Sequence, residues 1–211
     1  MKLLKTVWSQ SKLPLISIAI ALVVGVSVIQ ARNNRTELIL TGLGLNAELS
    51  EQGVSWIREE LSPLLGTGDG EGAAYASASM GSFTNSVTTE DYYLLKNIQN
   101  LCHSDSLDYF LLDKAAMENL IRQDMFLDLT DFFSEAELAD LEEYLIWAVE
   151  TPQEEGAKPD LEARRPVAVR VDGLPFFRDN CPEGARYFAI SSQSTRLEQC
   201  RILWNRLLSW R

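Results

Sequence analysis

The sequence predicts an α/β protein with a layered, mainly parallel sheet, preceded by one transmembrane helix at its amino terminus. Three observations support this prediction. Apolar runs of strand length alternate along the chain with helical patterns, as in strands that are joined by helical crossovers. Several of the expected helices begin with capping signals. A charge-free segment near the amino terminus has the length of a membrane span.

The amino-terminal segment LPLISIAIALVVGVSVIQA, residues 13–31, contains no charged residue. Its length is close to the roughly 20 residues that a helix needs to cross a bilayer. Three lysines before it, against two arginines after it, favour an amino terminus in the cytoplasm. We expect residues 1–35 to form a cytoplasmic tip and a single-pass anchor in the cell membrane, and residues 36–211 an extracytoplasmic domain. The alternative is a cleaved signal peptide, although Ile29-Gln30-Ala31 fits a cleavage site poorly.

The charges are distributed unevenly. The chain from Thr36 onward has 14 basic and 30 acidic residues. Phosphate backbones attract the opposite sign, so we expect no nucleic-acid partner. The three cysteines, Cys102, Cys181 and Cys200, lack zinc-ligand spacing, and His103 is the one histidine. We expect buried thiols or one disulfide, and no metal or other cofactor.

The first strand and helix are expected directly after the anchor. The segment ELILTGLGL, residues 37–45, is a short apolar run interrupted by glycines, which indicates a buried strand. Apolar residues then recur with a helical period from Leu49 to Leu64, and Pro63 and Gly66 mark the end of that helix.

The next elements are a weak strand, a helix and a strong strand. Residues 73–83 have weak strand character. Residues 88–101 predict a helix that Thr88 or Thr89 caps, with acidic residues in its first turn. Residues 107–112 are apolar and aromatic, as expected of a strand covered on both faces.

Asp113 ends this strand and stands before a helical pattern that includes Met117, Leu120 and Ile121. As an N-cap, its carboxylate would accept hydrogen bonds from the free N–H groups of that helix. The alternative is a ligand-binding or catalytic carboxylate at the carboxyl end of a strand, where open α/β sheets place their sites. We favour the cap, because capping alone accounts for the residue.

A second group of helical signals begins at Ser134. Ser134 and Glu137 form a capping box, and we expect the helix that they open to continue to about Val149. The following residues 150–166 are polar and proline-containing, which predicts a surface connection.

The carboxyl-terminal part predicts two strands and a helix. Residues 166–171 alternate like a strand, and residues 186–191 form another. Between them, DGLPFFRDN is expected to be a loop with an aromatic pair. Thr195 and Glu198 form a second capping box, which opens a final amphipathic helix.

These segments resemble the bacterial extracellular solute-binding proteins of the type II periplasmic-binding fold. The resemblance spans most of Glu37 to Leu208. Its features are the strand and amphipathic helix after the anchor, and three segments: LDYFLLDKAAMENLIRQDMFLDLTDFF, GLPFFRDN and YFAISSQSTRLEQCRILWNRLL.

The resemblance implies a single Rossmann-like three-layer lobe. Members of that family have two lobes, which close on a ligand in the cleft between them. In this chain only residues 134–165 separate the two halves of the lobe, which is too little for a second lobe. The usual ligand site would lack one wall and would leave much of a small ligand in water. The matching motifs are scaffold motifs, so no catalytic, cofactor, metal or ligand residue carries over.

Three functions are compatible with these observations. The first is a non-enzymatic, membrane-anchored binding module that contacts a partner protein, or binds a small solute weakly, beside a transporter for example. Its contact surface would be the exposed sheet edge or the face left by the missing lobe, with Phe176 and Phe177 as candidate contacts unless they fill the core. The second is a degenerate structural module without a ligand. The third is an α/β hydrolase, which the absence of Gly-x-Ser-x-Gly and the helical setting of His103 disfavour.

Overall fold

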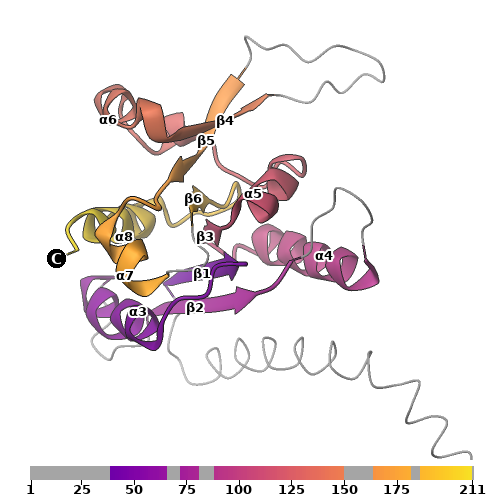
Figure 1. Cartoon of the computed structure of the whole chain (residues 1–211), viewed down its shortest axis with the longest axis horizontal. Helices are drawn as coiled ribbons and strands as arrows, with labels where there is room; N and C mark the ends of the chain where they lie inside the picture. Colours follow the sequence, from indigo (N-terminus) through magenta and orange to yellow (C-terminus); the bar gives the residue numbers. More distant parts are fainter. Residues whose placement is uncertain (1–38, 66–71, 81–87, 150–163, 182–185, 211) are drawn as a thin grey trace, which may run out of the picture. The chain divides into compact units, whose positions relative to one another are not determined.

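Six strands of the described residues form one sheet. The computed structural model describes residues 39–65, 72–80, 88–149, 164–181 and 186–210. The strand order is β2-β1-β3-β6-β5-β4 (Figure 1). The strands are β1 (Leu40–Leu45), β2 (Ala73–Ala78), β3 (Tyr109–Leu112), β4 (Leu145–Val149), β5 (Arg164–Arg170) and β6 (Tyr187–Ile190).

The sheet is mixed, so the prediction of an α/β fold is confirmed and that of a mainly parallel sheet is wrong. β1 pairs in parallel with β2 and β3. β6 runs antiparallel to β3 and β5, and β5 runs antiparallel to β4. Apolar runs and cap signals identify strands and helices but do not encode strand direction, which tertiary pairing decides.

Helices cover both faces of the sheet (Figure 1). Those on one face are α3 (Glu51–Trp56), the π-helical η1 (Ile57–Leu61), the 3₁₀ helix η2 (Ser62–Leu65), α7 (Pro175–Asn180) and α8 (Leu197–Leu208). Those on the other face are α4 (Thr89–His103) and α5 (Lys114–Ile121). The remaining short elements are η3 (Leu129–Asp131), α6 (Glu135–Asp140) and η4 (Glu142–Tyr144).

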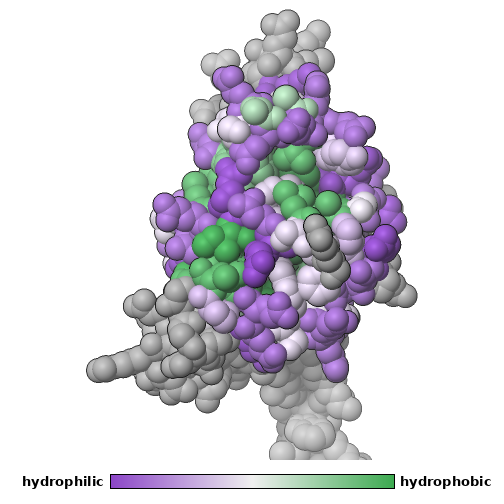
Figure 2. All heavy atoms as spheres, turned by 90° about the vertical axis from the view of Figure 1, so that its left-hand side faces the viewer, coloured by the Kyte–Doolittle hydropathy of each residue, from purple (hydrophilic) through white to green (hydrophobic). Residues whose placement is uncertain are grey.

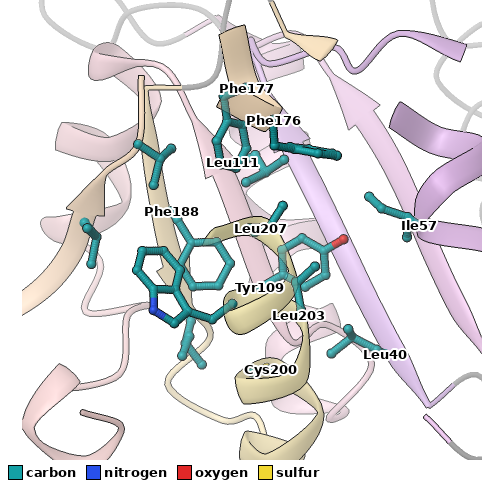
Figure 3. Close-up of a cluster of buried hydrophobic side chains, with 14 of the residues drawn as sticks. Leu40, Ile57, Tyr109, Leu111, Phe176, Phe177, Phe188, Cys200, Leu203 and Leu207 are labelled. Carbon is teal, nitrogen blue, oxygen red and sulfur yellow. The ribbon is translucent and has the colours of Figure 1, made fainter. Parts of the chain in front are cut away.

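Aromatic side chains dominate the core beneath α8. The ring of Tyr109 on β3 stacks on that of Phe188 on β6 at 5.9 Å, and Phe188 contacts Trp204 of α8 at 5.3 Å. Leu203 and Leu207 of α8 point into the same cluster (Figure 3). Each fully buried large side chain contributes on the order of 1.5–3 kcal/mol, so this layer is a main source of stability.

Two glycines of β1 permit this aromatic packing. A methyl group on Gly42 would occupy the place of the Tyr109 ring, and one on Gly44 would meet the hydroxyl of Tyr75. The Tyr75 hydroxyl in turn donates to the carbonyl of Ala47. The glycines of LTGLGL therefore have a packing role, because a side chain at position 42 would displace the buried ring of Tyr109 and one at position 44 would displace the partly buried Tyr75.

The helix predicted from Ser134 to Val149 is wrong in its second half. The capping box is confirmed, since the Ser134 hydroxyl accepts from the Glu137 N–H and the Glu137 side chain accepts from the Ser134 N–H. However, α6 ends at Asp140, and residues 145–149 form the edge strand β4. Their sequence LIWAV is rich in β-branched and aromatic residues, and pairing with β5 overrides the helical continuation.

Two local predictions in the carboxyl-terminal part are also wrong. The segment PFFRDN is the helix α7 with Pro175 in its first turn, where proline is favoured, and not a loop. α8 begins at Leu197 without a side-chain cap, because the Thr195 hydroxyl donates to the carboxylate of Asp105 instead of capping. The predicted box of Thr195 and Glu198 is therefore not formed.

The predicted anchor lies outside the described residues. Within the part of the chain that the structure does describe, no helix is both long and apolar enough for a membrane span. Residues 1–35 as tip and anchor remain an expectation.

Candidate functional site

Hydrogen bonds of the Asn46 and Asp113 side chains join the carboxyl ends of β1, β2 and β3. Asp113 caps α5, because its Oδ1 accepts from the N–H of Ala116 at 2.8 Å. Its Oδ2 accepts from Nδ2 of Asn46 at 3.2 Å. The Asn46 side chain also donates to the Met80 carbonyl at 2.9 Å and accepts from the Met80 N–H at 2.7 Å.

The cap interpretation of Asp113 is thereby confirmed. Asn46 follows β1 with a φ of 53°, a left-handed conformation that asparagine tolerates well. The Asn46 amide and both Asp113 oxygens already have hydrogen-bond partners. The carboxyl end of these strands therefore offers a ligand few unsatisfied polar atoms. Asn46 and Asp113 stabilise the carboxyl ends of the strands. Open α/β sheets usually place a ligand site there, but these two residues do not form one.

A buried carboxylate occupies the opposite end of β3. Asp108 is fully buried and accepts three hydrogen bonds, from the Thr41 N–H at 2.7 Å, the Ser194 hydroxyl at 2.8 Å and Nη1 of Arg196 at 2.9 Å. The same Nη1 donates to the carbonyl of Asp105 at 2.9 Å. This network joins β1, β3 and the start of α8.

The electrostatics of this network are those of a structural ion pair. Burial raises the pKa of the Asp108 carboxyl, although its three donors and the charge of Arg196 act in the opposite direction. Burial also raises the pKa of the nearby Cys200 thiol to about 12, and the Asp108 charge adds to that effect. A thiol with so high a pKa is a poor nucleophile at neutral pH.

The cysteines and the histidine do not form a reactive pair. Cys102, Cys181 and Cys200 are buried and no disulfide joins them. The Nδ1 of His103 lies 2.6 Å from the Gln99 carbonyl, so this ring nitrogen is engaged with the backbone of its own helix. Across the described ranges, no group of three His, Cys, Asp or Glu side chains is arranged to hold a metal ion.

Phe176 and Phe177 are core residues and not contacts. They are 0% and 1% exposed, and Phe176 packs against Trp56 and Trp210 with ring centres 4.9 Å and 5.1 Å apart. The alternative that they fill the core of the domain is therefore correct.

A shallow groove lies between η3 and α8. It has a volume of about 450 Å³, and we call it the acidic groove. Its lining residues are Asp131, Phe132, Leu197, Glu198, Arg201 and Ile202. Figure 2 shows the side of the molecule on which α6 and α8 lie. Apolar side chains reach the surface there between polar ones.

Arg201 is immobilised on one wall of the acidic groove. Its guanidinium lies 4.3 Å from the ring centre of Phe132 and 5.0 Å from that of Phe133. It also forms an ion pair of 2.8 Å with Glu137 of α6. The charge of Arg201 is therefore already compensated, and the groove presents an apolar floor with a fixed planar cation.

The carboxylates of the groove are not compensated in this way. Asp131 and Glu198 are exposed, and neither has a cationic partner within the described residues. Residues 123–149 include eight acidic and no basic residues. The rim of the groove is thus negative while its floor is apolar.

The edge strand β4 and the preceding η4 expose two aromatic residues. Trp147 and Tyr144 are 39% and 37% exposed. Arg164 lies 4.9 Å from the Trp147 ring centre, and Arg170 lies 5.4 Å from that of Tyr144. Charged side chains over an edge strand are a common protection against pairing with another chain. We therefore rank this edge below the acidic groove.

Comparison of the chain with protein-family models, curated proteins and solved structures gave no match.

Sequence reasoning did not identify the residues of the groove or the buried Asp108. The residues of the groove come from two segments separated by more than 60 positions, and only packing brings them together. A signal was nevertheless present, since an aspartate in the apolar run SLDYFLL is unusual in a buried strand.

Proposed function

We propose that this chain is a membrane-anchored, extracytoplasmic interaction module that binds a partner protein through the acidic groove and does not catalyse a reaction. The observation that carries the proposal is the groove itself, with an apolar floor on Phe132 and Ile202 and a fixed guanidinium at Arg201. Side chains that anchor a protein interface fill pockets on the partner protein.

The finer fold assignment belongs to this proposal. We infer that the body is a single lobe similar to one half of a type II solute-binding protein. The β2-β1-β3 parallel unit with helices on both faces is compatible with such a lobe. A site with one wall leaves much of a small ligand in water, which favours a protein partner over a solute.

The polar clusters favour interaction over catalysis. The Asp113 and Asp108 carboxylates are engaged in structural hydrogen bonds, and the Cys102 and Cys200 thiols have raised pKa values. A hydrolase needs an accessible nucleophile beside a base. A degenerate module without any ligand remains the alternative, and it predicts that the groove has no occupant.

Photo-cross-linking of the full chain in the cells that produce it tests the partner. Ile202 is replaced by p-benzoylphenylalanine, and Tyr93, which is 58% exposed on α4, receives the same replacement as a control. We expect a discrete protein adduct from position 202 and none from position 93. Absence of an adduct at 202 in a folded chain would contradict the proposal and support the degenerate module.

The location of the body is tested separately. We expect the full chain to resist alkaline extraction from membranes and the body to be cut by protease added outside the cell. Release by alkali, or protection from that protease, would contradict the anchor or its orientation.

A further inference from the structure

We infer that the partner segment in the acidic groove is basic, with Lys or Arg side chains beside an apolar anchor residue. This inference rests on the proposed function. It follows from the uneven charge of this face, where Asp131 and Glu198 stand at the groove without a cationic partner among the described residues.

The floor of the groove indicates which kind of partner side chain can bind there. Phe132 is nearly buried, whereas Leu197 and Ile202 are partly exposed, so an aliphatic or aromatic side chain of the partner would cover them. The volume of about 450 Å³ has room for a few side chains of the partner. Arg201 does not attract an acidic side chain of the partner, because Glu137 already pairs with it.

The carboxylates at the rim of the groove favour a positively charged partner segment. Each of the two carboxylates can pair with a cation at the edge of the contact, where such pairs act mainly on the association rate and on specificity. The rest of the chain also attracts a basic partner, since residues 36–211 have a net charge of −16. At a physiological screening length of about 8 Å, however, only the groove carboxylates are close enough to act strongly. The effect of the groove carboxylates can therefore be separated by experiment from the effect of the net charge.

The test compares two double variants with the same change in net charge. Asp131→Lys with Glu198→Lys reverses the charge of the groove rim. Glu59→Lys with Glu60→Lys reverses two exposed carboxylates on η1 and is the matched control. Both are made in the full chain that has p-benzoylphenylalanine in place of Ile202, and circular dichroism verifies that each variant is folded.

We expect the groove variant to lower the yield of the adduct at least about tenfold, and the control variant to leave it within about twofold. Mass spectrometry of the adduct should locate the attachment in a segment with Lys or Arg beside an apolar residue. An adduct that is insensitive to the groove variant, equally sensitive to both variants, or attached to a segment without basic residues would overturn the inference. The proposed function would survive those outcomes, whereas loss of every adduct at position 202 would remove both.

Discussion

Removal of Arg196 should destabilise the fold by leaving a buried carboxylate without its cation. Asp108 is 0% exposed in its side chain and Arg196 is 28% exposed, with 2.9 Å between them. Breaking a fully buried pair costs about 3–5 kcal/mol. Arg196 is partly solvated and two neutral donors to Asp108 remain, so we expect Arg196→Met to lower the free energy of unfolding by about 2–3 kcal/mol at pH 7.

The loss should depend on pH with a defined sign. Burial already raises the folded-state pKa of Asp108 above its ordinary value of 3.8, and Arg196 opposes this rise. Without Arg196 the folded-state pKa rises further. A carboxyl with a raised folded-state pKa gives its full stabilisation below the unfolded-state pKa and loses it as the pH rises through the folded-state pKa. The penalty of Arg196→Met should therefore be smaller at pH 5 than at pH 7.

Urea unfolding of the full chain in detergent micelles, followed by tryptophan fluorescence, measures both effects. Asp108→Asn and the double variant complete a double-mutant cycle, and the double variant should lose less stability than the sum of the single variants. A loss below about 0.5 kcal/mol, or a loss that is equal at pH 5 and pH 7, would refute the ion-pair reasoning.

Three further predictions concern packing and the thiols. Gly42→Ala should lower the thermal midpoint, because its methyl group meets the Tyr109 ring and overpacking costs about 1–3 kcal/mol, whereas Gly173→Ala, with nothing near the added methyl, should be nearly neutral. A Gly42→Ala variant as stable as the control would contradict the packing role. Tyr109→Phe should raise the unfolding free energy by about 1 kcal/mol, because the buried hydroxyl has no hydrogen-bond partner among the described residues; a decrease would reveal an unrecognised partner. The cysteines should react with a thiol reagent at pH 8 only after urea is added, since burial protects them and raises the pKa of Cys200 to about 12, and rapid reaction of the native chain would contradict this.

Local signals predicted the central part of the fold. Thr88 caps α4 and Asp113 caps α5, both through side-chain bonds that sequence spacing alone indicates. The strand β3 was evident from its apolar run, because a strand buried on both faces has little room for polar residues.

Features that depend on distant contacts were not predictable in this way. The segment LIWAV follows a helix signal, and only the presence of β5 beside it makes it a strand. Thr195 has the spacing of a cap, but Asp105, about 90 positions earlier, competes for its hydroxyl. The acidic groove likewise exists only because η3 and α8 meet, so no local pattern could identify it.

The most direct test of the account is the adduct formed from position 202 of the full chain in the cells that produce it. We predict a single partner that attaches at position 202 and not at position 93, with a yield that falls in Asp131→Lys/Glu198→Lys and holds in Glu59→Lys/Glu60→Lys. A folded chain that yields no adduct at position 202, or the same adduct from both positions, would contradict an interaction module that acts through this groove.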